Sequence, residues 1–445
     1  MAGLTENLLG MLRPLILLFF LVPGSSVAQN YYYPPGEGSD WETIEGSSLG
    51  WNTMLYASLF RFLDDHNSKS FLVLYQGRIA IEWYADDFGP EKWWYWASAG
   101  KSLTASLVGI AQQKDWLDIN QKTSDILGDG WTRAPADKEA LITIRHQLTM
   151  TTGLDDRVDD QNCLDPECLN YRADAGTRWF YYNAPYRLLE DVLAKAGGMN
   201  INQVTNTLLG NQIGMGGLWL DYVRWGTARD MARFGLFALS EGSWAGKVVL
   251  DDPAYFYDMI HSSQSLNPSY GYLWWLNGYD SYILPGFGFS WPGPIIPDAP
   301  ADLYAALGKD DQKIYVVPSE DLVVVRQGNK AVPEALLALS PFDNELWHLL
   351  QAIIGGSTSS RSLDQRSDAI KVYPNPARMD QPVCINNPGP ALNGKLVDPS
   401  GKVMWTGIVA TGQNLYHFPV KHSGLFFLTV NGQGSLPKTS KLFFY

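Results

Sequence analysis

The sequence has little cysteine, little histidine and a deficit of positive charge. Only three of its 445 residues are cysteine, too few for a disulfide scaffold or a four-cysteine zinc site. The six histidines are scattered, without an HExxH pair, so we expect no metal ion and no other cofactor. The formal net charge of −13 argues against a nucleic-acid partner, because phosphate binding needs a basic surface.

The apolar content is high and the charge is unevenly distributed. With 46% hydrophobic residues the chain can bury a large core, and its length favours two or three globular domains. Residues 369–445 contain seven Lys and Arg against two Asp and Glu, a net charge of +5, whereas residues 29–368 sum to −18. We therefore expect two domains of opposite charge.

The N-terminus is typical of an export signal. Arg13 precedes an apolar run over residues 15–22 that is too short to span a bilayer, and small residues follow it. We predict a signal peptide over residues 1–28, with an uncleaved membrane anchor as the alternative and with Met1 or Met11 as the first residue. The predicted location is exported, that is, secreted or on the cell surface.

Export places the cysteines in an oxidising compartment. Cys163 and Cys168 are separated by four residues, and we expect them to form a disulfide that closes a small loop. Cys384 is then unpaired. A metal site at this pair is disfavoured because no histidine lies near it.

The C-terminal part has the pattern of a small β-sandwich. Residues 356–368 are polar and small, as in an interdomain linker. Short β-prone runs separated by turn residues follow over residues 369–445. A carbohydrate-binding or adhesion sandwich would share this general pattern.

Four motifs in order make residues 369–445 resemble the C-terminal sorting domain of type IX secretion substrates of Bacteroidetes. They are VYPNPA at 372–377, DPSGK at 398–402, SGLFFLTV at 423–430 and the terminal KL at 441–442. The resemblance implies the type IX secretion machinery as a partner and delivery across the outer membrane of a Gram-negative bacterium.

The body, residues 29–355, combines strands at its two ends with helices between them. Residues 71–84 and 314–326 each contain two β-prone runs around a turn, which predicts two hairpins. Helical spacing predicts helices over residues 98–113, 185–196, 201–209, 227–239 and 343–354, the last capped by Asp343. We therefore expect an α+β fold, with one antiparallel sheet closed by terminal elements and a helical subdomain.

The tetrad S-x-x-K occurs twice, and its context separates the two copies. Ser435 precedes Lys438 in a Gly- and Pro-containing stretch, while Ser98 and Lys101 open a predicted helix. Residues three apart on a helix share a face, so Lys101 can reach the Ser98 oxygen. Burial and nearby positive charge would lower the pKa of this lysine and make it a base. The alternative is an ordinary helix cap with a surface lysine.

A second candidate element lies just before the predicted helix at 185. Tyr181 and Asn183 form a Tyr-x-Asn triplet that can present both side chains from one loop. A phenol near a lysine would lose its proton more readily and could pass a proton to a leaving group. Asn183 could orient Lys101 and a substrate carbonyl. An ordinary aromatic loop is the alternative.

Four motifs in order resemble the β-lactamase-related serine hydrolases. They are Ser98-x-x-Lys101, LTMTTGL at 148–154, AGTRxxYxN at 175–183 and IYVVPxxDLVVV at 314–325. The group includes class C β-lactamases, family VIII carboxylesterases, D-amino-acid peptidases and 6-aminohexanoate-dimer hydrolases. The resemblance implies a β-lactamase/transpeptidase-like fold over residues 45–355.

The resemblance also implies roles for the candidate residues. Ser98 would form the acyl-enzyme, Lys101 and Tyr181 would share the acid–base work, and Asn183 would position substrate. The oxyanion hole would use the Ser98 N–H and one N–H from the strand edge before residue 314.

The third family motif departs from its usual Lys-Thr-Gly or His-x-Gly form. Gly308 and Lys309 are the nearest match and are predicted to bind substrate, but two aspartates follow. This difference disfavours β-lactam turnover and favours a small-molecule ester or short amide as substrate.

The sequence does not decide the roles of two nearby segments. Trp93, Trp94 and Trp96 could form an apolar pocket wall or simply be core. The acidic loop at 155–160 could attract an amine-bearing substrate or be solvated.

Two alternatives to an esterase or amidase remain at the level of sequence. One is a catalytically silent protein of the same fold that binds peptidoglycan or peptides, and another is a true β-lactamase or D-amino-acid peptidase. A Ser-His-Asp hydrolase is disfavoured because Trp96 stands where a GxSxG turn requires glycine. The sequence does not predict an oligomeric state.

Overall fold

The computed structural model describes most of the chain outside its N-terminal segment. The described residues are 31–36, 40–332, 338–356, 371–373, 377–379, 381–387, 389–398, 402–431 and 438–444. The predicted signal peptide, residues 357–368 of the predicted linker, and Ser435 lie outside them. Among the described residues, no helix combines the length and apolarity that crossing a membrane requires.

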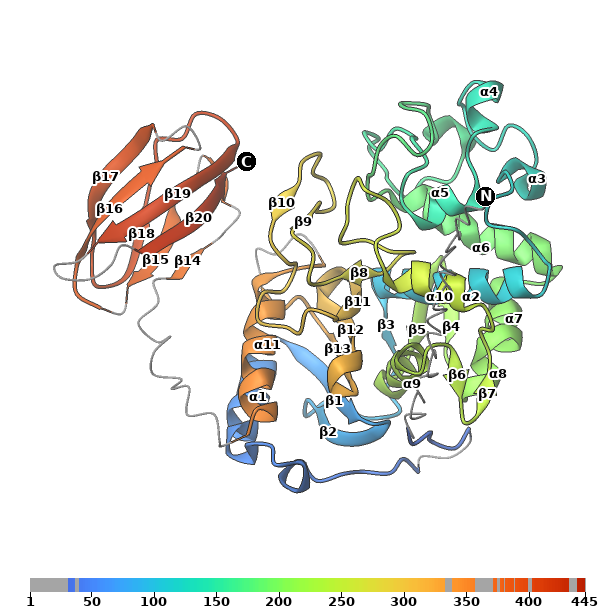
Figure 1. Ribbon diagram of the computed structural model, residues 1–445, viewed down its shortest axis with the longest axis horizontal. Helices are drawn as coiled ribbons and strands as arrows, with labels where there is room; N and C mark the ends of the chain where they lie inside the picture. Colours follow the sequence, from blue (N-terminus) through green and yellow to red (C-terminus); the bar gives the residue numbers. More distant parts are fainter. Residues whose placement is uncertain are drawn as a thin grey trace, which may run out of the picture.

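A six-stranded antiparallel sheet forms the centre of the body (Figure 1), in the order β2-β1-β13-β12-β11-β8. The first strand along the chain, β1, pairs with the last strand of this sheet, β13, and Leu72 lies opposite Val325. Gln76 and Gly77 both have positive φ in the turn between β1 and β2, as a tight hairpin turn requires. Both predicted hairpins and the closure by terminal elements are confirmed. The strands are β1 Ser68–Tyr75, β2 Arg78–Tyr84, β8 Trp275–Leu276, β11 Tyr304–Gly308, β12 Gln312–Val317 and β13 Leu322–Gly328.

Helices cover both faces of this sheet. Ile314 and Tyr315 are neighbours in β12 and point to opposite faces. A Cβ on Gly235 of helix α9 (Ala228–Leu239) would lie 3.0 Å from Ile314, so α9 packs directly on one face. Tyr315 meets Trp347 of α11 (Pro341–Ile354) on the other face, where α1 (Tyr56–Asp65) also packs.

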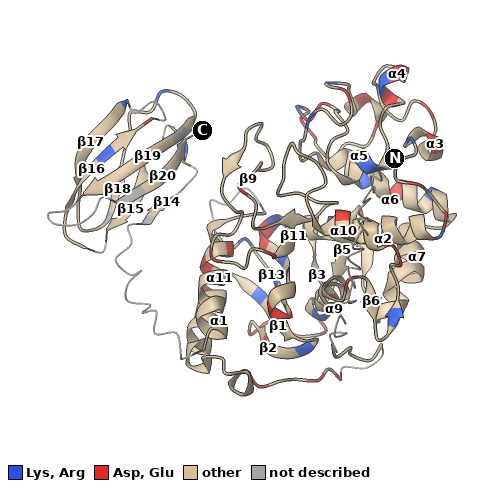
Figure 2. Ribbon diagram, viewed as in Figure 1, with Lys and Arg blue, Asp and Glu red and all other residues tan. Residues whose placement is uncertain are grey.

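The remaining helices form the predicted helical subdomain and its connections. In Figure 2 the acidic residues of the body are spread over several helices and loops. The helices are α2 Gly100–Gln113, α3 Ser124–Leu127, α4 Ala136–Glu139, α5 Ile144–Leu148, α6 Asn183–Gly197, α7 Ile201–Thr205, α8 Asn211–Ile213 and α10 Pro253–Ile260. The short 3-10 turns are η1 Gly46–Leu49, η2 Thr53–Leu55, η3 Ala97–Ala99, η4 Pro166–Cys168, η6 Lys309–Asp311 and η7 Pro318–Glu320, and η5 Asn206–Gly210 is a π-helical turn.

Three helix predictions need correction. The helix predicted from Ser98 begins at Gly100, because Ser98 lies in the 3-10 turn η3. The helix predicted over 201–209 is interrupted by the π-helical turn η5. Helix α11 is capped by Ser340, and Asp343 is the third residue of that capping box rather than the cap.

Short strand pairs complete the body. One three-stranded sheet joins the approach to Ser98 to the helical subdomain, in the order β3-β5-β4. The short strands are β3 Trp94–Tyr95, β4 Leu218–Leu220, β5 Val223–Gly226, β6 Ser243–Trp244, β7 Lys247–Val248, β9 Ser281–Tyr282 and β10 Trp291–Pro292.

The C-terminal strands form two antiparallel sheets with a core of their own. One sheet has the order β14-β15-β18 and the other β17-β16-β19-β20. Ile385, Leu396 and Phe426 are fully buried in this core, which shares no residue with the core of the body. The strands are β14 Lys371–Tyr373, β15 Val383–Asn387, β16 Leu392–Val397, β17 Val403–Val409, β18 Gly412–Tyr416, β19 Gly424–Asn431 and β20 Lys438–Phe444. The polar strand β18 was not predicted from the sequence, and the domain boundaries stay predictions.

Candidate active site

Ser98 is presented by a sharp turn at the start of α2. Ala97, just before it, has a φ of 48°, a conformation that costs energy for a residue with a side chain. The N–H of Trp96 donates to the Arg224 carbonyl at 2.8 Å and fixes the approach to the turn. Ser98 is half-buried in η3 and is followed at once by α2.

Lys101 lies directly behind Ser98. Its Nζ is 2.7 Å from Ser98 Oγ and 3.1 Å from Asn183 Oδ1, and the residue is 2% exposed. The ring of Tyr186 has its centroid 3.8 Å from the Lys101 Nζ, and the ring of Tyr181 lies 4.8 Å away. A lysine enclosed in this way loses much of the hydration that stabilises its charged form.

The pKa of Lys101 is lowered well below its ordinary value. Burial is the main cause, the positive charge of Arg187 adds to it, and Glu190 acts in the opposite direction. The burial and the nearby positive charge that the sequence analysis called for are present, and the role of Lys101 as a base stays a prediction. The rings next to the amine are those of Tyr181 and Tyr186.

Tyr181 is held by aromatic neighbours in front of α6. It is buried, it stacks on Trp275 of β8 with ring centroids 6.0 Å apart, and Tyr270 meets its edge. Burial raises the pKa of Tyr181, and a hydrogen bond with Ser98 offsets only part of that rise. The sequence analysis expected this phenol to lose its proton more readily, whereas burial shifts its pKa in the opposite direction. Tyr181 stays protonated and can serve as a proton donor.

Asn183 is the first residue of α6 and connects the lysine to a neighbouring loop. Its Oδ1 accepts from Lys101, and its Nδ2 donates to Asn162 Oδ1 at 3.1 Å. Asn162 directly precedes Cys163, which the structure pairs with Cys168 in a disulfide with Cα atoms 6.0 Å apart. The residue just before the disulfide loop thus contacts Asn183, which accepts the hydrogen bond from Lys101.

The third motif lies in the turn that joins β11 to β12. Gly308 ends β11 next to η3, and a Cβ on Gly308 would lie 2.4 Å from the Trp96 carbonyl and 3.1 Å from the Ala99 nitrogen. Only glycine allows this approach of the strand to the Ser98 turn. Lys309 follows with an exposed side chain, so the structure brings both predicted binding residues to the side of Ser98.

The two aspartates after Lys309 have different environments. The Tyr95 hydroxyl donates to Asp310 at 2.6 Å. Asp311 is buried and lies 3.1 Å from Lys313 Nζ, which also bonds Asp343. Asp311 is therefore part of an internal ion-pair cluster with Lys313 and Asp343, although the sequence analysis counted it with Asp310 as part of the altered third motif.

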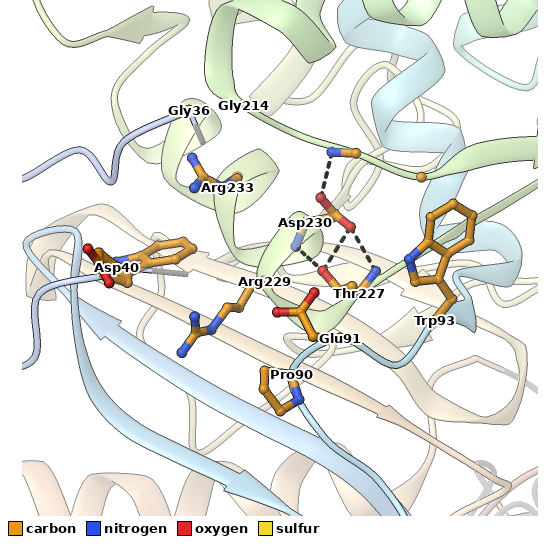
Figure 3. A pocket seen from close by; sticks show the side chains of 13 residues that line it. Gly36, Asp40, Pro90, Glu91, Trp93, Gly214, Thr227, Arg229, Asp230 and Arg233 are labelled. Atoms are coloured by element: carbon orange, nitrogen blue, oxygen red, sulfur yellow. Dashed lines mark hydrogen bonds between the residues drawn. The ribbon is translucent and has the colours of Figure 1, made fainter. Parts of the chain in front are cut away.

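The tryptophans before Ser98 do not line the Ser98 site together. Trp96 is fully buried against Phe234, and the Trp94 indole donates to the Gly328 carbonyl. Trp93 is 47% exposed and lines a separate pocket of about 220 Å³, in which Asp230 is bonded to Thr227 (Figure 3). None of the predicted site residues lines that pocket.

The acidic loop at 155–160 is neither a free amine-attracting surface nor fully solvated. Asp156 is 4% exposed and forms ion pairs with Arg172 and Arg178. Asp155 lies 3.3 Å from Arg172. These contacts neutralise the inner part of the loop.

Sequence reasoning missed three residues on α6 that surround the amine. Tyr186, Arg187 and Glu190 lie three, four and seven residues after Asn183, which places them on the helix face that Asn183 presents to Lys101. That spacing was the signal available in the sequence. Among the described residues, no group of three or more His, Cys, Asp or Glu could hold a metal ion.

The fold is that of the β-lactamase/transpeptidase-like proteins, with an antiparallel sheet, flanking helices and a helical subdomain. Residues 61–224 match the Beta-lactamase family model, a segment that contains Ser98, Lys101, Tyr181 and Asn183. In sequence comparison, no curated protein matches the chain.

Solved structures similar to this chain support the same fold. One is a Bacillus anthracis protein assigned provisionally as a 6-aminohexanoate-dimer hydrolase, with a TM-score of 0.55 and 17% identity over 72% of this chain and 89% of that chain. Another is a penicillin-binding protein homologue of Caulobacter crescentus, with a TM-score of 0.53 and 14% identity over 70% of this chain and 99% of that chain. A third, EstCE1, is described as a hydrolase with promiscuous acyltransferase activity, with a TM-score of 0.51 and 16% identity over 68% of this chain and 99% of that chain.

Proposed function

We propose that the protein is an exported serine hydrolase that cleaves an ester or amide bond through an acyl-enzyme on Ser98. The observation that carries the proposal is the buried Lys101 amine, with a lowered pKa, 2.7 Å from the Ser98 oxygen. A serine hydroxyl needs such a base to become a nucleophile. The family match over residues 61–224 supports the same chemistry.

The neutral amine can make both of its observed contacts at once. It donates one N–H to Asn183 Oδ1 and keeps its lone pair for the Ser98 O–H. Lys101 takes the serine proton while Oγ forms a bond to the substrate carbonyl carbon. The intermediate then expels an alcohol or amine, which receives a proton through the Tyr181 hydroxyl. Water enters by the reverse sequence and releases the acid.

The developing oxyanion needs two hydrogen-bond donors. The Ser98 N–H lies in η3, close to the start of α2, and is one of them. The second comes from the turn after Gly308, which the glycine allows to lie against η3. Lys309 is positioned beside this turn to meet a substrate group.

An ester or short amide is the preferred substrate class. The usual third motif is replaced by Gly308-Lys309-Asp310, and Asp310 is bound to Tyr95. β-Lactam turnover or D-amino-acid peptidase activity is the second candidate, supported by the fold and the penicillin-binding-protein-like neighbour. A silent peptidoglycan- or peptide-binding protein is favoured only by the altered third motif.

Export and sorting belong to the same proposal. Residues 1–28 would direct the chain out of the cytoplasm, and residues 369–445 would deliver it through the type IX secretion machinery to the cell surface or medium. The motif order in the last 75 or so residues and the two-sheet arrangement of β14–β20 support this role.

The activity is tested with the mature chain from Gln29 and its Ser98→Ala variant. Both are incubated with activated esters, amino-acid amides and a chromogenic cephalosporin. We expect ester or amide turnover that Ser98→Ala reduces by about a thousandfold or more. Equal turnover by the two proteins would exclude Ser98 as the nucleophile, and turnover by neither would favour the silent binder. Turnover of the cephalosporin alone would favour the β-lactamase.

A further inference from the structure

The amine of Lys101 is enclosed mainly by one face of α6. Asn183 accepts its hydrogen bond, and Tyr186, one turn later, presents its ring at 3.8 Å. Arg187 and Glu190 continue this face at helical spacing. Helices α2 and α6 pack against each other along this line.

Arg187 is held near this face by aromatic groups. Its guanidinium lies 5.7 Å from the ring centroid of Tyr222, in the turn between β4 and β5, and it bonds to Tyr186. Its Nε is fully buried and has no hydrogen-bond partner among the described residues. Arg187 is partly buried, and a cation shielded in part from water acts more strongly on nearby charges than a fully exposed one.

We infer that Arg187 is a positioning residue whose fixed positive charge keeps Lys101 a neutral amine able to accept the Ser98 proton, an inference that rests on the proposed acyl transfer. An arginine keeps its charge throughout the working pH range. It therefore opposes a second positive charge on Lys101 whatever the pH. Burial alone would act on Lys101 in the same direction, and Arg187 strengthens the effect.

The other ionisable groups around Lys101 do not cancel this charge near neutral pH. Burial raises the pKa of Glu190 to about 8, so its carboxyl is largely protonated at pH 7. The Tyr181, Tyr186 and Tyr270 phenols have raised pKa values because they are buried, and they stay neutral.

Arg224 of β5 is a second cation near Glu190. It donates to the Gly216 carbonyl, and its charge acts on Glu190 together with that of Arg187. Arg187 lies on the face of α6 that Asn183 and Tyr186 present to the amine, and its positive charge opposes a second positive charge on Lys101.

The test measures how fast Ser98 reacts with a fluorophosphonate as a function of pH, followed by intact mass. The proteins are the mature chain, Arg187→Met and Arg187→Lys, with Arg187→Gln as a second neutral variant should Arg187→Met not fold. Removing the charge should raise the pKa of Lys101. The acid limb, the part of the pH–rate profile in which the rate rises with pH, should then move to higher pH by about one unit, so that the rate below its midpoint falls about tenfold. Arg187→Lys should restore the original limb.

Lys195→Met is the matched control. Lys195 lies on the same helix, is exposed and donates to the Leu127 carbonyl at 3.0 Å. Lys195→Met therefore removes one positive charge from a part of the helix away from Lys101. We expect its acid limb to coincide with that of the wild type. An unshifted limb in folded Arg187→Met or Arg187→Gln, or an equal shift in Lys195→Met, would overturn the inference.

A second measurement separates this inference from the proposed function. If wild-type Ser98 does not react at any pH, acyl transfer fails, and the charge of Lys101 is then read from stability. The pKa of Lys101 is lower in the folded protein than in the unfolded chain, so Lys101 destabilises the fold at low pH. This loss of stability grows as the pH falls below about 10, the pKa of an unfolded lysine, and levels off at the pKa of Lys101 in the folded protein. Lys101→Met removes this loss and should therefore raise the free energy of unfolding, both in the wild type and in Arg187→Met. We expect the gain to level off at a higher pH in Arg187→Met than in the wild type. Levelling at the same pH in both would overturn the inference.

Discussion

Single side chains determine whether Lys101 can act as a base. Among the described residues, no charged group is in hydrogen-bond contact with its amine, which donates to the neutral amide of Asn183. Burial and the positive charge of Arg187 both lower its pKa. Small changes of charge beside this amine should therefore have large effects on the pH dependence of catalysis.

Asn183→Asp tests the lysine directly. It would place a carboxylate about where the amide oxygen lies, 3.1 Å from Nζ. An opposite charge at this distance raises the pKa of Lys101, so the acid limb of kcat/KM should move to higher pH by one unit or more. Asn183→Ala removes the same hydrogen bond without adding charge and should leave the limb at or below its original pH. Identical limbs in the two variants would contradict a neutral Lys101.

Tyr181→Phe tests the proton donor. The variant keeps the ring that stacks on Trp275 but removes the hydroxyl, so kcat should fall by about 10²–10⁴ while the fold is retained. Tyr270→Phe is the control, because its hydroxyl is buried without a hydrogen-bond partner among the described residues. A comparable loss of kcat in both variants, measured with the same activated ester, would remove the special role of Tyr181.

At the scale of elements, the site depends on the close approach of β11 to the turn η3. Gly308→Ala would bring a Cβ to 2.4 Å from the Trp96 carbonyl, and a backbone neighbour cannot move aside as a flexible side chain can. We expect a loss of about 1–3 kcal/mol in unfolding free energy and a fall in the rate of Ser98 acylation, measured by denaturant unfolding and by ester turnover. The control is Gly288→Ala, where a Cβ meets nothing within 4 Å. Wild-type acylation in folded Gly308→Ala would exclude this turn from the oxyanion site.

The elements that repeat a simple pattern were predictable from the sequence. Period-two runs around Gln76-Gly77 gave the hairpin, and helical spacing gave α6, α9 and α11 to within a few residues. Ser98 was placed in a helix although it lies in η3, since the positive φ of Ala97 depends on tertiary contacts that no local pattern encodes.

The candidate site was predictable only in part. The residues Ser98, Lys101, Tyr181 and Asn183 were found from motif order, and the structure brings them together. The direction of the Tyr181 pKa shift was not found, because it depends on burial by Tyr270 and Trp275, which lie more than 80 residues away in sequence. The pairing of Asp311 with Lys313 and Asp343 likewise requires the fold.

At the scale of the whole molecule, the body and the C-terminal strands have separate cores. Each therefore has the apolar contacts to fold by itself. A chain that ends at residue 355 should keep Ser98 acylation within about twofold of the full-length mature chain, measured with the same fluorophosphonate, and in cells it should fail to leave through the proposed secretion route. Loss of acylation on truncation, with the body still folded, would show that the C-terminal strands contribute to the site.

The acyl-enzyme itself tests the central claim most directly. The mature chain is mixed with an activated ester, quenched in acid within seconds, and analysed by intact mass and peptide mapping, with Ser98→Ala treated in parallel. We predict one added acyl group, located on Ser98, that decays on incubation and is absent from the variant. An adduct on another residue would contradict the claim. So would turnover of the ester that leaves no adduct in rapidly quenched wild-type protein and that is unchanged in Ser98→Ala.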